Sequence, residues 1–256
     1  MGIGVDLGGT KIEAVGLDDD NREHDRQRVP TPVGDYTATI YAITQLVANV
    51  DRAADPARGI GVGIPGTVSP ATGLVKNANS TWLIGRPLDV DLETALGRPV
   101  RLANDANCFA MSEAHDGAAA EASVVFGAIL GTGVGGGIII DGNPLIGRDA
   151  IAGEWGHSPL PDRRDDERPG ETCYCGRRGC IETYLSGPAL ARDAKWDAAA
   201  GIEGIADAAT AGDACADAAL GRYIGRLARA LATVINLVES GRYRPRRWVV
   251  EHRPPV

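Results

Sequence analysis

Two stretches of the chain share one pattern of apolar and polar positions. Residues 2–7 and 12–17 are apolar-rich strand patterns with the pair Gly8-Gly9 between them. Residues 123–130 and 137–140 are also strand-like, and a glycine-rich turn joins them. Each pair predicts a hairpin. The repetition suggests two related lobes, each offering a phosphate-sized loop towards a shared cleft.

Other segments alternate between strand and helix patterns. Residues 36–50 carry apolar side chains at helical spacing, and residues 107–115 also look helical. Short buried strands are predicted at residues 59–64 and 99–103. Residues 188–239 are rich in alanine and predict helices, the longest over roughly 217–238. The mixture predicts an α/β fold, in which ligands bind at strand ends.

Composition and net charge disfavour several classes of binding partner for this chain. The chain has 256 residues and a net charge of −8, which would repel a phosphate backbone, so we expect no nucleic-acid partner. No run approaches the roughly 18 apolar residues of a spanning helix, and no signal sequence opens the chain, so we expect a cytoplasmic protein without a membrane partner. Five cysteines, an odd number with three clustered, argue against a disulfide framework there.

The glycine-rich turns are candidate phosphate loops. In "VDLGGTK", a strand ends in Asp6 and is followed by Gly8, Gly9, Thr10 and Lys11. Such a loop allows close backbone approach, offers amide donors and places an acid near a metal ion. An ordinary hairpin turn is the alternative.

The second loop, "GTGVGGG", has more glycine than a turn requires. The alternative is that these glycines only allow the chain to turn between two strands. The candidate phosphate-binding residues of this loop are Gly131, Thr132, Gly133, Gly135, Gly136 and Gly137.

Asp105 in "RLANDAN" is a candidate general base. It follows an apolar strand and precedes a predicted helix, so its carboxylate could project into a cleft and accept a proton from a substrate hydroxyl. It would be ionised at neutral pH, because the ordinary pKa of Asp is about 3.9. The alternative role is that of a helix N-cap.

Three cysteines and one histidine make a candidate zinc site. The spacing Cys173-x-Cys175-x4-Cys180 supplies three thiolates, and His157 is the available fourth donor. A redox pair usually shows Cys-x-x-Cys, which is absent, but redox or incidental cysteines stay open as alternatives. A site closed by four protein donors would be structural.

The zinc would tie two loop segments together and hold Glu154 and Glu182 at the cleft, where carboxylates accept hydrogen bonds from polyol hydroxyls. His157 could bind the metal through one ring nitrogen and offer the other to substrate or carboxylate. A plain surface role for either glutamate is the alternative.

Taken together, the motifs resemble the ROK family of bacterial sugar kinases and related repressors. "DLGGTK", "GIPG", "LANDAN", "GTGVGGG", "GEWGH" and "CYCGRRGCIE" occur in the family's order and spacing, between residue 2 and about residue 239. Within the family, "RVPTP", "SPATGLVKNANSTWL" and "AGEWGHSPLP" resemble the fructokinases (mannofructokinases) most closely.

The resemblance implies an actin-like, ribonuclease H-like two-lobed ATPase fold and a homodimer. It implies MgATP-dependent phosphorylation of a hexose, most closely D-fructose to fructose 6-phosphate, with glucose, mannose or N-acetylhexosamine as alternatives. Asp105 would be the catalytic base, and structural Zn²⁺ would be held by the four donors named above. The residues implied to bind the sugar are Gly66, Asn79, Asn104, Glu154, His157 and Glu182.

We expect a small lobe over residues 1–115, a large lobe over 116–239 and an atypical tail over 240–256. The family continues after such a helix into a strand and a glycine triplet, so the chain is expected to be C-terminally truncated. Read one nucleotide later, suitable codons turn the tail into "NPDVIVLGGGLSNIDRL", which resembles the missing segment. We therefore hypothesise a frameshift, with a lineage-specific tail as the alternative.

A truncated, catalytically dead sugar-binding protein is a rival function. A sugar-sensing repressor is another, but it needs a DNA-binding segment ahead of residue 2.

Overall fold

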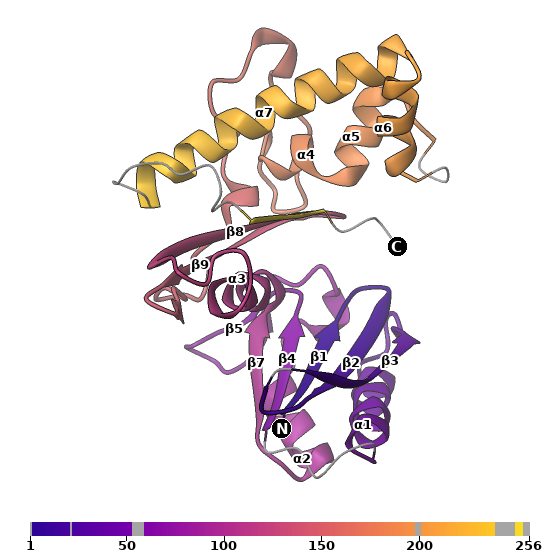
Figure 1. The fold of residues 1–256 in the computed structure, drawn as a ribbon, viewed down its shortest axis with the longest axis vertical. Coiled ribbons are helices and arrows are strands. Elements are labelled where there is room, and N and C mark those ends of the chain that lie inside the picture. The colour runs from indigo at the N-terminus through magenta and orange to yellow at the C-terminus, as the bar shows by residue number, and fades with distance from the viewer. Residues whose placement is uncertain (1, 21, 53–58, 198–200, 239–248, 253–256) are drawn as a thin grey trace. The chain divides into compact units, whose positions relative to one another are not determined.

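The computed structural model describes residues 2–20, 22–52, 59–197, 201–238 and the backbone of 249–252. The chain forms two compact units, which are described separately (Figure 1). Unit 1 comprises Met1–Cys108 and Ile146–Ile151, and unit 2 comprises Phe109–Leu145 and Ala152–Val256. The division falls within one helix, α3 (Asp105–His115), after Cys108, whereas the sequence analysis expected the lobe boundary after residue 115 and placed residues 146–151 in the large lobe.

Unit 1 is built on a five-stranded sheet in the order β3-β2-β1-β4-β7. Strands β1, β4 and β7 run parallel, while β1, β2 and β3 form an antiparallel meander. Its elements are β1 (Gly2–Leu7), β2 (Lys11–Leu17), β3 (Glu23–Pro30), α1 (Tyr36–Arg52), β4 (Gly59–Ile64), β5 (Thr67–Val68), β6 (Val75–Lys76), η1 (Thr81–Leu83), α2 (Leu88–Leu96) and β7 (Val100–Asn104).

The sheet of unit 1 has one well-packed face. Alternate residues of β1 and β2 are buried, as the two-residue period of a strand requires. Helices α1 and α2 contact the sheet and each other, so both cover the same face. Leu7, Ile12, Ile43 and Leu92 belong to the core that they enclose. The sequence analysis missed β3, whose polar, largely exposed residues suit a sheet edge, and also missed α2.

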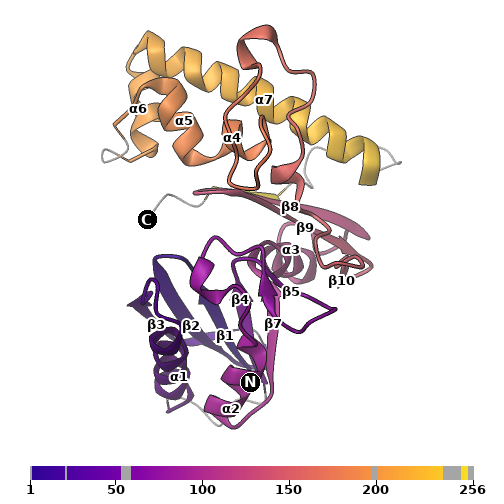
Figure 2. The same cartoon turned by 180° about the vertical axis from the view of Figure 1, so that it is seen from behind.

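Unit 2 joins a four-stranded sheet to a layer of helices, seen from the opposite side in Figure 2. The sheet order is β10-β9-β8-β11. Its elements are β8 (Val124–Leu130), β9 (Val134–Ile140), β10 (Asn143–Pro144), η2 (Trp155–His157), η3 (Asp165–Glu167), α4 (Glu182–Leu185), α5 (Gly187–Ala194), α6 (Glu203–Thr210), α7 (Ala214–Val238) and β11 (Val249–His252).

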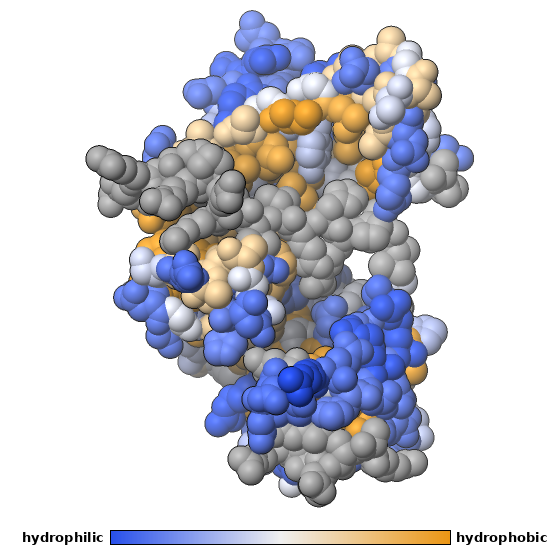
Figure 3. Space-filling view, in the orientation of Figure 1, coloured by the Kyte–Doolittle hydropathy of each residue, from blue (hydrophilic) through white to orange (hydrophobic). Residues whose placement is uncertain are grey.

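Helix α7 organises the helical layer of unit 2. It packs against α4, α5 and α6, and buries Ala216, Ala219, Ala230 and Val234. Small side chains on that face let the neighbouring helices approach closely. Hydrophobic residues gather beneath α7 in the space-filling view, whereas a hydrophilic surface covers β2 and β3 of unit 1 (Figure 3).

The structure confirms both predicted hairpins, β1–β2 and β8–β9, and the short strands β4 and β7. Of the predicted tail, only Val249–His252 is described, and it pairs with β8 in parallel as β11. The sequence analysis did not predict this strand. The rest of the tail lies outside the described residues. Within the described part of the chain, every helix is too short or too polar to cross a membrane.

Candidate functional site

The predicted residues of unit 1 collect at one edge of its sheet. Asp6 stands near the end of β1, opposite Gly63 of β4, and Asn104 ends β7, opposite Ile64. Because the carboxyl ends of parallel strands meet at one edge, this edge holds the polar residues that follow each strand. The structure thus brings the first candidate loop and the candidate base to the same side of unit 1.

The first candidate phosphate loop is a tight turn. The Gly8 amide donates to the Lys11 carbonyl at 3.0 Å, and the Thr31 hydroxyl donates to the Gly8 carbonyl at 2.8 Å. A Cβ at residue 8 would lie 2.8 Å from the Lys11 oxygen, which explains glycine there. Gly9 and Thr10 are exposed at the tip.

Asn104, rather than Asp105, caps helix α3. Its side-chain oxygen accepts hydrogen bonds from the amides of Ala106 and Asn107 at 3.0 and 3.3 Å, and its amide nitrogen donates to the Gly66 carbonyl at 3.1 Å. Asp105 is the first helical residue, and one of its oxygens accepts from the next amide at 2.8 Å. The N-cap role that the sequence left open for Asp105 therefore belongs mainly to its neighbour.

Two other predicted sugar-binding residues lie in the loops of unit 1. Gly66 adopts a φ of 98°, and a Cβ there would lie 2.6 Å from the Lys76 carbonyl oxygen. Asn79 is exposed, and its side chain accepts a hydrogen bond from the buried Ser80 hydroxyl at 3.5 Å. Glycine is required at residue 66 by conformation and by space.

The second glycine loop joins β8 to β9, and the segment around η2 packs directly on β9. The Trp155 indole donates to the Gly135 carbonyl at 2.7 Å. A Cβ on Gly153 would lie 2.3 Å from the Gly136 oxygen, and one on Gly156 would lie 2.1 Å from the Val134 oxygen. These close approaches explain both glycines of "GEWGH" and fix Glu154 and His157 relative to the loop.

Glu182 links the second loop to the cysteine cluster. One carboxylate oxygen accepts a hydrogen bond from the Val134 amide at 3.0 Å, and the other lies 4.0 Å from the Cys173 sulfur. A Cβ on Gly133 would lie 2.8 Å from the same carboxylate. The Val134 amide of this loop is therefore paired with a carboxylate, which fixes Glu182 against the loop.

Glu154 is placed where its charge is disfavoured. Burial raises the pKa of this carboxyl, the neighbouring His157 works to lower it, and the charge of Glu182 raises it further. The charge of Glu182 thus adds to burial in disfavouring the ionised form of Glu154.

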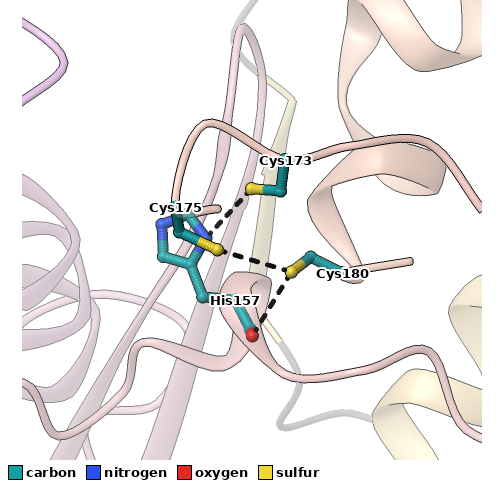
Figure 4. Close-up of side chains that lie close together, drawn as sticks. All are labelled: His157, Cys173, Cys175 and Cys180. Carbon is teal, nitrogen blue, oxygen red and sulfur yellow. Dashed lines mark hydrogen bonds between the residues drawn. The ribbon is translucent and has the colours of Figure 1, made fainter. Parts of the chain in front are cut away.

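The four predicted metal donors form one cluster (Figure 4). The donor atoms of His157, Cys173, Cys175 and Cys180 all lie within 4.8 Å of one another. The Cys175 and Cys180 sulfurs are 3.7 Å apart, and the Cys173 sulfur is 3.5 Å from His157 Nδ1. Tetrahedral zinc would separate two sulfurs by about 3.8 Å and a sulfur from a nitrogen by about 3.6 Å.

The donor set therefore fits zinc in both chemistry and spacing. All five cysteines of the chain are free thiols. Burial raises the pKa of the Cys173 thiol, and that of Cys180 to about 12. At Cys175 the same effect of burial is outweighed by hydrogen bonds from the Arg177 amide and the neighbouring thiols, which lower the pKa to about 7. A bound cation would stabilise all three as thiolates.

One residue of this region escaped the sequence analysis. Tyr174 lies between two cysteines, and its hydroxyl is 2.9 Å from Nε2 of His157. The only local signal was its place inside the cysteine motif, which does not reveal where its side chain points.

The comparisons with known proteins agree with this architecture. Residues 2–242 match the model of the ROK family. The chain is 40% identical over 245 residues to an N-acetyl-D-glucosamine kinase of Salmonella paratyphi C, covering 93% of this chain and 81% of that protein. An N-acetyl-D-glucosamine kinase of Escherichia coli O127:H6 is 46% identical over 196 residues, covering 75% of this chain and 64% of that protein.

Solved structures show the same fold. A ROK hexokinase from Thermus thermophilus superimposes with a TM-score of 0.80 at 30% identity, covering 98% of this chain and 81% of that one. A ROK glucokinase from Streptomyces griseus, solved with glucose and AMPPNP, gives a TM-score of 0.75 at 33% identity, covering 93% and 80%. The fold is therefore the actin-like α/β fold of sugar kinases. The chain belongs to the ROK family.

Proposed function

We propose that this ROK-family kinase transfers the γ-phosphoryl group of ATP to a hydroxyl of a hexose or hexosamine, with N-acetyl-D-glucosamine as the first candidate. The observation that carries the proposal is the position of Glu182, between the glycine loop and the cysteine cluster. The Glu182 carboxylate there contacts both a candidate phosphate loop and the cysteine cluster that is proposed to position the sugar-binding acids. The identity with N-acetyl-D-glucosamine kinases supports the choice of sugar.

In this proposal Asp105 accepts the proton of the attacking sugar hydroxyl. The hydroxyl oxygen forms a bond to the γ-phosphorus, the bond from that phosphorus to the bridging oxygen breaks, and ADP leaves. Positioning and charge neutralisation dominate such transfers. The loops of residues 8–11 and 131–137 would bind the phosphates, while the amides of Gly8, Gly131 and Val134 keep their hydrogen bonds to Lys11, Gly133 and Glu182. Asp6 would stand near the Mg²⁺ ion that accompanies ATP.

The sugar would be held by hydroxyl contacts. Glu154 and Glu182 would accept hydrogen bonds from sugar hydroxyls, with His157 as a further partner. Asn79 and Asn104, which the family resemblance also assigns to the sugar, belong to unit 1. A zinc ion held by His157 and the three cysteines would leave no open position for water, so it supplies structural restraint.

Fructose is the second candidate substrate. "SPATGLVKNANSTWL" and "AGEWGHSPLP" favour it because they resemble fructokinase segments. None of the relatives reported above carries that name, which is why the hexosamine comes first. A catalytically dead sugar-binding protein remains the rival, and the frameshift hypothesis for residues 240–256 motivates it.

A sugar panel tests the proposal. ADP release from MgATP is measured with N-acetyl-D-glucosamine, N-acetylmannosamine, glucose, mannose and fructose. We expect N-acetyl-D-glucosamine to give a kcat/KM at least about tenfold above fructose, equivalent to about 1.4 kcal/mol of transition-state binding. The reverse order would establish fructose. Calorimetric binding of sugar without turnover of any sugar would support the rival.

A further inference from the structure

Tyr174 makes an unusual contact for an exposed side chain. Its side chain is 68% exposed, yet its hydroxyl lies 2.9 Å from Nε2 of His157, and the two rings meet edge to face with centroids 5.0 Å apart. The residue sits between two candidate zinc donors, so the fold of the cysteine loop determines where its ring lies. The exposed phenol of Tyr174 therefore contacts the imidazole of His157, a candidate metal and sugar ligand.

The two nitrogens of His157 face different partners. Nδ1 lies 3.5 Å from the Cys173 sulfur, inside the candidate zinc cluster. Nε2 points away from the sulfurs, so it is the nitrogen left for a sugar hydroxyl. Tyr174 holds that nitrogen.

The Tyr174 hydroxyl can replace a sugar hydroxyl at His157. A phenol hydroxyl donates and accepts hydrogen bonds as a sugar hydroxyl does. The Cys173 sulfur lies 3.5 Å from Nδ1 of His157 and 4.0 Å from a carboxylate oxygen of Glu182, so the imidazole that Tyr174 contacts adjoins a second group proposed to bind the sugar.

We propose that the Tyr174 hydroxyl occupies a sugar-hydroxyl position in the sugar-free protein and that sugar binding displaces it. This inference rests on the proposed function. Displacement exchanges one hydrogen bond to His157 for another, and the exposed ring can swing into solvent without opening the core. A net hydrogen bond contributes about 0.5–1.5 kcal/mol, so the competition weakens sugar binding by roughly 2- to 12-fold.

Tyr174→Phe in the zinc-loaded full chain tests the proposal by calorimetry. The dissociation constant for N-acetyl-D-glucosamine is expected to fall by about 2- to 12-fold, with the zinc affinity and the ATP dissociation constant unchanged. Tyr41→Phe is the matched control, because Tyr41 is 65% exposed and lies on α1 of unit 1. Unchanged or weaker sugar binding overturns the proposal. Weaker zinc binding also overturns it, since Tyr174 would then be an outer partner of the metal.

A second measurement does not need a sugar. The imidazole ¹⁵N signals of His157 report the contact directly, and Tyr174→Phe is expected to shift the Nε2 signal in the sugar-free protein. Unmoved signals mean that the contact is absent and overturn the proposal. If the wild-type chain binds no sugar of the panel, the proposed function fails and the displacement claim falls with it. If the wild type binds sugar and Tyr174→Phe binds no tighter, only the displacement claim fails.

Discussion

The Glu182 carboxylate reaches the Val134 amide because residue 133 has no side chain. A Cβ on Gly133 would lie only 2.8 Å from one oxygen of Glu182, the oxygen that accepts the hydrogen bond of that amide. Gly133 therefore leaves the space that the Glu182 carboxylate occupies beside the loop. At the scale of single residues, a proposed sugar-binding acid and a candidate phosphate loop share one hydrogen bond.

Gly133→Ala should displace Glu182 from the loop. We expect the sugar dissociation constant to rise by about 10- to 150-fold, because one charge-assisted hydrogen-bonding group, typically contributing about 1.5–3 kcal/mol, loses its position. Calorimetry measures this. Gly225→Ala on α7, where a Cβ meets nothing within 4 Å, is the control and should leave sugar binding unchanged. Equal binding by both variants would contradict the role given to Glu182.

A second residue-scale device is the buried ion network of Glu167 in unit 2. Its carboxylate accepts hydrogen bonds from Arg229 at 2.7 and 2.9 Å, from Arg226 at 3.0 Å and from the Arg164 amide at 2.9 Å. Burial works to raise the pKa of Glu167, but these donors outweigh it and lower the pKa to about 2. The charged form is therefore favoured by folding.

Glu167→Gln should make unit 2 less stable at neutral pH. A carboxyl with a pKa lowered from 4.5 to about 2 contributes roughly 3 kcal/mol to the free energy of unfolding above pH 4.5, and loses it as the pH falls towards 2. Urea unfolding of wild type and variant should show a gap of about 3 kcal/mol at pH 7 that closes between pH 4.5 and 2. The exposed Glu121→Gln is the control. A gap independent of pH would refute the charge-based explanation.

At the scale of elements, the loop that carries the cysteines has little regular structure of its own. Residues 171–181 form turns and isolated bridges, such as Pro159 with Cys180 and Thr172 with Arg178. Two of its cysteines are buried. A metal ion that joins this loop to η2 would replace the packing that a helix or strand would otherwise supply.

Removal of the metal should loosen this loop selectively. We expect purified protein to hold about one zinc per chain, and chelation to speed amide hydrogen exchange over residues 171–182 while α7 stays protected. Cys180→Ser should abolish stoichiometric zinc, whereas Cys215→Ser, outside the cluster, should retain it. Zinc-free protein with a slowly exchanging loop would mean that the cysteines are structural thiols.

Elements with strong local patterns could be predicted from the sequence. The hairpins follow from apolar strands around glycine, and the clustering of the three candidate zinc-binding cysteines follows from their spacing. The edge strand β3 has no apolar period, because most of its side chains face solvent. The Glu182–Val134 and His157–Tyr174 contacts join residues far apart in the chain, so no local pattern encodes them. Asn104 and Asp105 are both cap formers, and only the structure distinguishes them.

At the scale of the whole molecule, each unit supplies a glycine loop and a set of polar side chains. Unit 1 carries Asp105 and the first loop, and unit 2 carries Glu154, Glu182 and the second loop. Both loops are hairpin turns beside a central strand. The match to the ROK family spans residues of both units, over 2–242, and the fold is shared with sugar kinases.

The most direct test is transfer of the γ-phosphoryl group from labelled ATP to N-acetyl-D-glucosamine by the wild-type chain and by Asp105→Asn. Asparagine keeps an oxygen for the Ala106 amide, so the start of α3 should remain folded. We predict phosphorylated sugar with the wild type, and a kcat lower by about 10²- to 10⁴-fold in the variant at an unchanged sugar dissociation constant. Equal rates in the two proteins, or no phosphorylated sugar from zinc-loaded wild type with any sugar of the panel, would contradict the account.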